Sequence, residues 1–427
     1  MSLQPDDSVE TSTLSNGLRV VTHRMPHLQS ATLGVWVGSG SRHETEAMHG
    51  ISHLLEHMAF KATLNRSARQ MAEEIEAVGG EINAATSHET TAYFARVLAP
   101  DTGLALDLLA DMLICPKFDG AELERERGVI LQEIAAANDQ PEDLVYEQAE
   151  EAAFTGQPLG RPILGTPQSV GRITAGDLSL HMAQHYTASR MVLGAAGAVD
   201  HGALVRHAEA LFGRFNAGES PAAQPARFAG GVRFADEPFE QHHVLMAFEG
   251  PSYVDPGFYS AQVLAGLLGG GASSRLFQKV REDHGLCYAI EAFGWGYSDT
   301  GVIGVHAATG SDMVKDLTEM VAIEMGDIAS NGPTGPELER AKAQMRAGLL
   351  MSLESSGARA EQLARHVMVH GRPLSTAELT DSVSAVTAMA VRDLAGQVFS
   401  AASPVWSEVG PGADGREASR LTRLLAR

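Results

Sequence analysis

One pattern of strand, turn and helix occurs twice in this chain, about half a chain length apart. The strand-like segment 31–37 leads through a glycine-rich turn into a helical pattern at 51–60, and segment 243–248 leads through a Gly- and Pro-containing turn into a helical pattern at 259–268. The two strand-like segments begin about 212 residues apart in a chain of 427. This spacing predicts two structurally repeated halves, although their sequences show no strong identity.

The boundary between the halves is expected where the composition changes. Residues 216–231 are rich in Ala, Pro and Gly, as linkers are, and the pattern restarts after them. We therefore predict an N-terminal domain at 1–215, a linker at 216–231 and a homologous C-terminal domain at 232–427.

The order of elements in the first half predicts the fold class. Strands are expected at 17–23, 31–37, 81–86 and 90–97, and helices at 51–60, 67–78 and 120–137. We predict that the first two strands pair with each other. Such mixed elements indicate an α+β fold rather than a doubly wound sheet.

The composition excludes several classes of protein. The chain has 53 acidic and 32 basic residues and a formal charge of −21, which argues against nucleic-acid binding because phosphate contacts need clustered Lys and Arg. The apolar run 191–199 is too short to cross a membrane, which takes about 20 residues. With 44% hydrophobic and 20% charged residues, the composition is that of an ordinary globular protein.

The cysteines and the first residues suggest a compartment. Only Cys115 and Cys287 are present, so one chain can build neither a disulfide framework nor a cysteine zinc site. The first seventeen residues contain Asp6, Asp7 and Glu10 but no Lys or Arg, unlike a secretory signal or a mitochondrial presequence. We expect a bacterial cytoplasmic protein; the alternative is the mitochondrial matrix, if a presequence has been removed.

The feature with the clearest chemistry is the sequence His53-Leu-Leu-Glu56-His57, an H-x-x-E-H pattern in an apolar helical run. At about 100° per residue, the three polar side chains share one helix face. Two imidazoles one turn apart can hold Zn²⁺, and a carboxylate beside them can take a proton from a metal-bound water. The alternative is coincidence, which the 17 histidines of the chain make possible.

A catalytic zinc needs a third protein ligand. Glu126 and Glu133 are seven residues apart in a helical pattern and so lie on the same face, within about 20°. One can ligate the metal while the other supports the site, and the spacing does not say which; both can also be solvated carboxylates of an acidic helix. His49 is a rival ligand, because His49, His53 and His57 form an i, i+4, i+8 stripe, but its place near the helix start favours an outer or exposed residue over a ligand.

Three segments, 49–63, 80–93 and 126–133, together resemble the pitrilysin/insulinase family of zinc metallopeptidases. The likeness spans the whole chain and is closest to the roughly 400-residue branch of the mitochondrial processing peptidase β-subunit and its bacterial relatives. In the family pattern the third ligand follows the second histidine by 76 positions, which is Glu133 here. The resemblance implies that His53, His57 and Glu133 bind one Zn²⁺ per chain, that Glu56 is the general base, and that Glu126 supports the site.

The resemblance also assigns substrate-binding residues. The segment 268–288 is similar to a C-terminal signature whose Arg and Tyr, here Arg281 and Tyr288, reach the active site. Arg can bind a carbonyl or carboxylate, and a Tyr hydroxyl can stabilise an oxyanion; the alternative is that both only pack a helix–strand junction. Asn83, Ala84 and Ala85 lie on a strand onto which the resemblance implies that an extended peptide adds.

These features predict a zinc metalloendopeptidase acting on unfolded or short, basic peptides. The resemblance implies two homologous α/β-sandwich halves, each an antiparallel-rich sheet with helices packed on it, that enclose a chamber, with metal only in the first half. It also implies a homodimer, or a heterodimer with a homologous partner. The alternative is a noncatalytic peptide-binding or assembly subunit of the same family.

Overall fold

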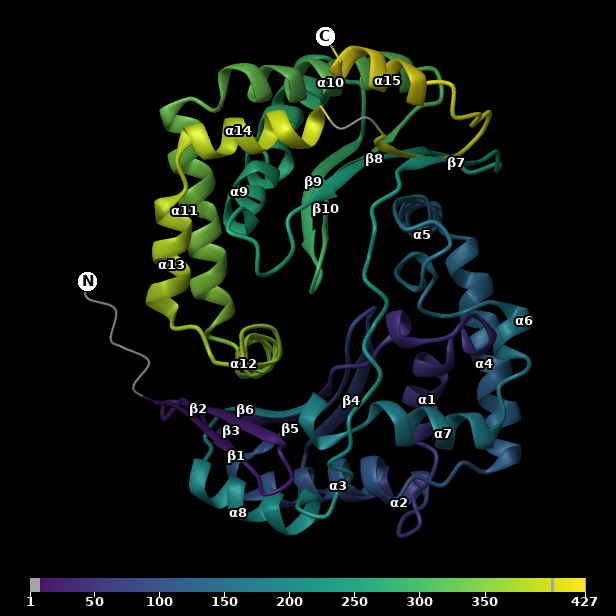
Figure 1. Cartoon of the computed structure of the whole chain (residues 1–427), viewed down its shortest axis with the longest axis vertical. Coiled ribbons are helices and arrows are strands. Elements are labelled where there is room, and N and C mark those ends of the chain that lie inside the picture. The colour runs from purple at the N-terminus through teal and green to yellow at the C-terminus, as the bar shows by residue number, and fades with distance from the viewer. Residues whose placement is uncertain (1–7, 401–402, 427) are drawn as a thin grey trace. The chain divides into compact units, whose positions relative to one another are not determined.

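The computed structural model describes residues 8–400 and 403–426. The outermost residues of the expected domains, Asp6 and Asp7 among them, lie outside this range. The described chain forms two compact units, each built on one β-sheet (Figure 1). The first unit contains the chain up to Ile134, Pro162–Gln224 and Leu350–Ala377, and the second contains Ala135–Arg161, Pro225–Leu349 and the chain from Glu378 onward.

The sheet of the first unit has six strands in the order β1-β2-β6-β3-β5-β4. Their bounds are β1 Val9–Thr13, β2 Arg19–Arg24, β3 Ser30–Val37, β4 Glu81–Thr86, β5 Thr91–Leu98 and β6 Met191–Gly197. All pairs are antiparallel except β2 with β6, which is parallel. The mixed α and β composition confirms the α+β fold class.

The predicted pairing of the strands near 17–23 and 31–37 is wrong, because β6 lies between β2 and β3 and pairs with both. Every residue of β6 is buried. An apolar strand of small residues is most stable at a position flanked by strands on both sides and covered on both faces, and only a non-local pairing provides that position.

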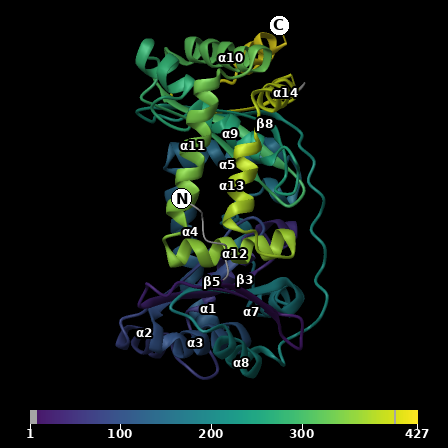
Figure 2. The ribbon, with the colours of Figure 1, turned by 90° about the vertical axis from the view of Figure 1, so that its left-hand side faces the viewer.

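Helices cover both faces of this sheet. The helices of the first unit are α1 Ile51–Ala59, α2 Ala68–Ala77, α3 Thr102–Ile114, α6 Pro167–Val170, α7 Ala175–His185, α8 His201–Phe212 and α12 Ser356–His370. Helix α4, Gly120–Asn138, begins in this unit, and its residues from Ala135 onward belong to the second. The main core packs apolar residues of α1, α3 and α8 against one face, and α12 packs on β2, β3 and β6 from the other side (Figure 2). A capping box of Ser67 with Gln70 starts α2, which agrees with the helix expected from residue 67.

The sheet of the second unit has five strands in the order β7-β11-β8-β10-β9. Their bounds are β7 Gly231–Ala235, β8 His242–Gly250, β9 Ala289–Gly296, β10 Gly301–Thr309 and β11 Val405–Val409. The helices are α5 Pro141–Ala153, α9 Phe258–Gly269, α10 Val314–Asn331, α11 Gly335–Ser352, α13 Thr376–Ala385, α14 Ala388–Phe399 and α15 Ala418–Leu425. Strand β8 leading to α9 corresponds to the repeat expected at 243–268.

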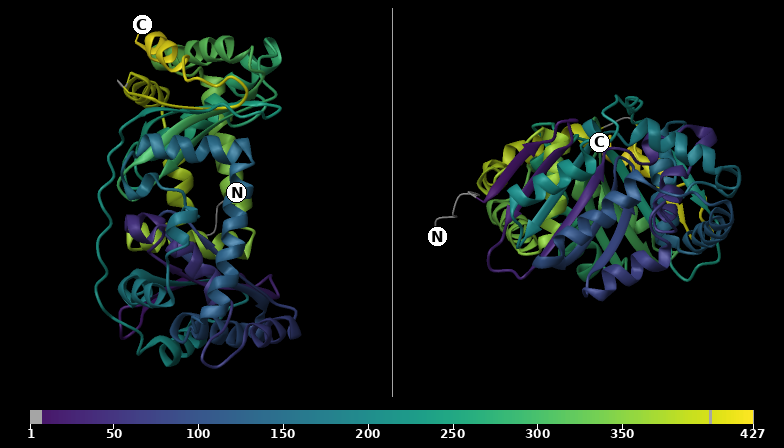
Figure 3. Two further views of the ribbon diagram at one scale, coloured as in Figure 1. Left: turned by 90° about the vertical axis from the view of Figure 1, so that its right-hand side faces the viewer. Right: turned by 90° about the horizontal axis from the view of Figure 1, so that it is seen from below.

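Two helices belong to the unit opposite to their half of the sequence. Helix α5 comes from the N-terminal half but packs on β7, β8 and β11 of the second unit, where Figure 3 shows it in blue against that sheet. Helix α12 comes from the C-terminal half but belongs to the first unit, with Leu363 and Val367 buried against Val21 and Trp36. Each helix covers an apolar sheet face that would otherwise be exposed to water.

Candidate active site

The helix that carries the H-x-x-E-H pattern begins later than the histidine stripe suggests. Helix α1 starts at Ile51, after Gly50, which has a φ of 89° and provides no side-chain cap. The buried carboxylate of Glu44 replaces that cap: its oxygens accept hydrogen bonds from the amides of Gly50 and Ser52, both at 2.8 Å. A negative charge at this end of a helix is favourable, so Glu44 fixes the start of α1.

His49 lies before this helix and is turned away from its polar face. Its ring is buried, and its Nε2 atom lies 2.6 Å from the carbonyl oxygen of Pro162, to which it donates a hydrogen bond. The i, i+4, i+8 stripe therefore does not form, because the backbone turns at Gly50.

The two faces of α1 differ in burial: one packs in the core, and the other carries the H-x-x-E-H side chains. The apolar face is buried in the core of the first unit through Ile51, Leu54, Leu55 and Met58. The opposite face presents His53, Glu56 and His57, which are only partly buried. The apolar contacts thus hold the helix while its polar face remains accessible.

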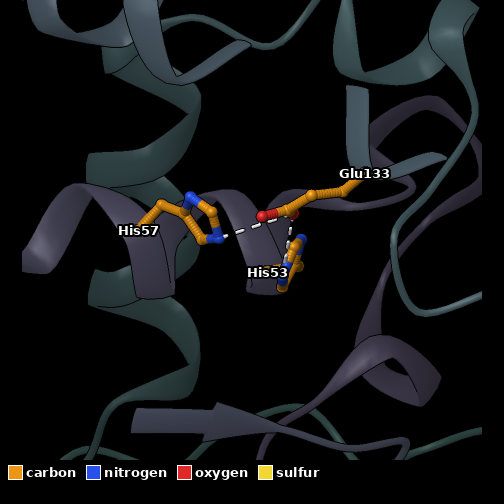
Figure 4. A group of neighbouring side chains, drawn as sticks. All are labelled: His53, His57 and Glu133. Atoms are coloured by element: carbon orange, nitrogen blue, oxygen red, sulfur yellow. Dashed lines mark ion pairs between the residues drawn. The ribbon is translucent and has the colours of Figure 1, made fainter. Parts of the chain in front are cut away.

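His53, His57 and Glu133 form a group of possible metal ligands. One ligand atom from each lies within 4.8 Å of the others. The Oε2 atom of Glu133 lies 3.8 Å from Nε2 of His53 and 3.7 Å from Nε2 of His57, and Figure 4 shows both imidazoles of α1 directed toward this carboxylate. Two imidazole nitrogens and one carboxylate oxygen are a donor set that zinc takes in catalytic sites, with a further position left for water.

The protonation of the cluster also suits a cation. Burial, with the neighbouring His57, lowers the pKa of His53 to about 4. The neutral imidazole is the form that ligates a metal. The side chain of Glu133 is 41% exposed, so the cluster is accessible from one side.

Glu126 lies beside His57 rather than between the two histidines. Its Oε2 atom accepts a hydrogen bond from Nδ1 of His57 at 3.0 Å, and its Oε1 atom lies 2.7 Å from Nζ of Lys61. Burial alone would raise the pKa of Glu126, but the hydrogen bonds from Lys61 and His57 outweigh it and lower that pKa. The two carboxylates that the spacing left equivalent thus have different geometries.

Glu56 is held by Thr86, through the hydroxyl and the backbone of that residue. The Oγ1 atom of Thr86, at the end of β4, donates to Oε2 of Glu56 at 2.5 Å. Burial raises the pKa of Glu56, while the hydrogen bond from Thr86 opposes the shift. A carboxylate with a raised pKa is a stronger base, as proton transfer near neutral pH requires.

Strand β4 forms one edge of the first sheet and pairs only with β5. Asn83 and Ala85 are exposed, whereas Ala84 and Thr86 are half-buried, in the alternation expected of a strand. The Oδ1 atom of Asn83 accepts a hydrogen bond from the amide of Ala84 at 2.9 Å. The other edge of β4 has no strand partner among residues 8–400 and 403–426.

Arg281 and Tyr288 belong to the second unit and lie close to each other. Arg281 is in a π-helical segment, Phe277–Asp283, and its guanidinium carbon lies 4.6 Å from the ring centre of Phe277 and 5.9 Å from that of Tyr288. Tyr288 directly precedes β9, and its side chain is largely solvent-exposed. Its ring therefore contributes little to packing.

No sequence pattern assigned a role to Glu44, Lys61 or Thr86. The alternation of a strand places Thr86 on the same face as Ala84, and this pattern could have indicated Thr86 as a candidate residue. Glu44 and Lys61 carry no comparable local signal, since their partners are fixed only by tertiary packing.

The second unit holds another group of ligand atoms, from Glu142, Glu291 and His306. The hydroxyl of Tyr146 donates to Glu291 at 2.9 Å, and Nε2 of His306 lies 3.0 Å from Nδ1 of His243. Both carboxylates are exposed. The group differs from the first in having a single histidine ligand.

The chain matches known families and proteins over most of its length. Residues 19–167 match the model described as "Insulinase (Peptidase family M16)", and residues 172–345 match "Peptidase M16 inactive domain". An "Uncharacterized zinc protease" of Rickettsia bellii is 37% identical over 95% of this chain and 98% of its own. The mitochondrial-processing peptidase subunit beta of Lentinula edodes is 37% identical over 88% of this chain and 84% of its own.

Solved structures show the same fold. A chain of complex III2 from Candida albicans superposes with a TM-score of 0.87 at 23% identity, over 98% of this chain and 100% of that one. No helix in the described part of the chain is long and apolar enough to cross a membrane. The family matches and the 37% identity to zinc proteases and a processing-peptidase subunit establish that the chain belongs to the insulinase family of peptidases, M16.

Proposed function

We propose that this protein is a zinc-dependent metalloendopeptidase that hydrolyses unfolded or short peptides, with a preference for basic ones. The observation that carries the proposal is the convergence of His53, His57 and Glu133, whose ligand atoms lie within 4.8 Å of one another beside the carboxylate of Glu56. The names of the relatives as zinc proteases support the choice of metal.

The residues of the first unit then have distinct tasks. One Zn²⁺ per chain, held by His53, His57 and Glu133, would polarise the scissile carbonyl and acidify a water molecule. Glu56 accepts a proton from the attacking water and then donates a proton to the leaving amine. The raised pKa of Glu56 supports both transfers, because it brings the two protonation states closer in energy near neutral pH.

The substrate is proposed to add to the free edge of β4. An extended peptide would pair there by main-chain hydrogen bonds beside Asn83, Ala84 and Ala85, which favours unfolded substrates over folded ones. In the second unit, Arg281 would bind a substrate carbonyl or carboxylate, and the Tyr288 hydroxyl would stabilise the oxyanion. The exposure of Tyr288 supports this role.

We also propose how the two halves of the protein are organised, how it assembles and where it is located. Two homologous halves, 1–215 and 232–427, would enclose a chamber, and the protein would act as a homodimer or pair with a homologous partner. The similarity to a processing-peptidase subunit beta supports pairing. A bacterial cytoplasmic location, or the mitochondrial matrix after removal of a presequence, stays a prediction.

The test is cleavage of a quenched basic peptide by wild type, Glu56→Gln and the control Glu46→Gln. Glu46 is exposed and lies in the turn before α1. We expect Glu56→Gln to keep its zinc and to lose at least about 100-fold in kcat, the usual contribution of a positioned general base. Glu46→Gln should match wild type. Equal cleavage by Glu56→Gln would remove Glu56 as the base.

The second candidate is a noncatalytic peptide-binding or assembly subunit. Two observations support this alternative. Residues 172–345 match an inactive domain, and the chain shares its fold with a chain of complex III2. A wild-type protein that binds zinc and peptide but cleaves no peptide of a diverse library would establish this alternative.

A further inference from the structure

We propose that Thr86 is a positioning residue that holds the carboxylate of Glu56 in its working orientation and ties it to the end of strand β4. This inference rests on the proposed peptidase function, and it gives a role to a residue that neither the motif nor the family comparison singles out.

The contact is short and specific. The hydroxyl of Thr86 donates to Oε2 of Glu56 at 2.5 Å. Thr86 is the hydrogen-bond partner of Glu56 among the described residues, and its backbone adds to the bond from its hydroxyl. Both contacts come from one residue, so Thr86 fixes the orientation of the carboxylate, as a base that must point at one water molecule requires.

The residue type suits the task. Glu has three rotatable side-chain bonds, so an unheld carboxylate samples many orientations and pays rotamer entropy to adopt one. Threonine is β-branched and stiff at χ1, and its hydroxyl therefore has few alternative positions.

The backbone of Thr86 is itself fixed. Thr86 pairs with Thr91 at the end of the β4–β5 ladder, and the turn that follows is closed by a hydrogen bond from the Ser87 amide to the Thr90 carbonyl oxygen at 2.8 Å. The hydroxyl of Ser87 donates to the same carbonyl oxygen at 3.0 Å. The position of the Thr86 hydroxyl is thus set by the sheet and not by α1.

This arrangement links substrate binding to the base. Strand β4 has a free edge, and a peptide pairing there is held in a register relative to its residues. Because Thr86 belongs to that strand and contacts Glu56 on α1, the same strand that aligns the peptide aligns the base.

Three variants test the inference: Thr86→Val, which keeps the shape but removes the hydroxyl, Thr86→Ser, which keeps the hydroxyl, and the control Thr91→Val. Thr91 is the cross-strand partner of Thr86 and is fully buried, and its hydroxyl donates to the Ser39 carbonyl oxygen, not to Glu56. The control therefore reports the cost of losing a buried threonine hydroxyl from this hairpin.

We expect Thr86→Val to lower kcat roughly 10-fold or more with little change in KM, since the base is misaligned while main-chain pairing remains. Thr86→Ser should restore kcat to within about threefold of wild type, and Thr91→Val should change stability more than kcat. Bound zinc, measured by mass spectrometry, should be the same in all variants. A wild-type kcat in Thr86→Val, a loss confined to KM, or no rescue by Thr86→Ser would overturn the inference.

A readout without turnover separates this inference from the proposed function. Crystal structures of zinc-loaded wild type and Thr86→Val should show one orientation of the Glu56 carboxylate in the first and a rotated or multiple one in the second. If wild type cleaves no peptide, the proposed function fails, whereas an unchanged Glu56 in Thr86→Val contradicts the positioning role alone.

Discussion

The Nδ1 atom of His57 donates a hydrogen bond to Oε2 of Glu126 at 3.0 Å, and this bond determines which nitrogen of the ring is free. With the proton on Nδ1, the Nε2 lone pair faces Glu133, 3.7 Å away. His53 has no equivalent, because its buried Nδ1 atom has no hydrogen-bond partner among the described residues. Outer carboxylates of this kind fix ring orientation and raise the basicity of a ligand.

Glu126→Gln should weaken zinc binding by about 10- to 100-fold, because the amide is a poorer acceptor for the His57 proton. Lys61→Met should have a smaller effect in the same direction, since it removes only the cation that holds Glu126. Competition with a fluorescent zinc chelator measures both. Glu124→Gln, an exposed position on the same helix, should behave as wild type; wild-type affinity in Glu126→Gln would contradict the supporting role.

Glu133→Gln should lower zinc affinity more than Glu126→Gln does, because the first change removes a proposed ligand and the second only an outer contact. Stoichiometry after dialysis should fall from one zinc per chain toward zero. The reverse order of the two variants would exchange the assignments of the carboxylates.

Glu44→Ala should loosen the start of α1, because two buried amides lose their acceptor at a cost of about 1–3 kcal/mol each. Glu44→Gln keeps one carbonyl oxygen as an acceptor and should cost less. Hydrogen exchange at the amides of Gly50 and Ser52 checks this directly, with the exposed Glu46→Ala as control. Unchanged protection of both amides in Glu44→Ala would show that the cap is dispensable.

The stability of the first unit should fall as the pH drops below about 6.5. Burial lowers the pKa of His43 to about 3, with help from Arg190, and burial lowers that of His181 to about 3 as well. Between pH 6.5 and 3 the unfolded chain therefore binds protons that the folded chain does not, and each histidine contributes a slope of up to about 1.4 kcal/mol per pH unit.

Thermal unfolding followed between pH 7 and pH 4 tests that expectation. The melting temperature of His181→Gln should decline less steeply with falling pH than that of wild type. The variant lacks one histidine that binds a proton only in the unfolded chain. A parallel decline in both proteins would mean that His181 becomes protonated in the folded state.

The negative charge of the chain predicts a salt effect. If part of the −21 formal charge faces the peptide, cleavage of a Lys- and Arg-rich peptide should weaken as ionic strength rises, since the Debye length shrinks from about 10 Å at 0.1 M to about 3 Å at 1 M. A neutral peptide is the control, and its kcat/KM should change little. Equal salt dependence for both peptides would exclude electrostatic attraction.

The sequence by itself determined the local part of the site. The spacing of His53, Glu56 and His57 places all three on one face wherever that segment is helical, because the helix repeat depends only on neighbouring residues. For the same reason the predicted strand at 81–86 and helix at 51–60 agree closely with β4 and α1. Family resemblance added Glu133, which the helical spacing could not distinguish from Glu126.

Only the tertiary structure decided the rest. It brought Glu133 to the two histidines, and Glu126 to His57 and Lys61. The contact with Glu44 made α1 begin after His49. Strand β6 was inserted between β2 and β3, and α5 and α12 were exchanged between the units. Each of these depends on burying apolar surface or satisfying polar groups between segments far apart in the chain. Local propensity does not encode such contacts, because their free energy exists only once the distant partner is in place.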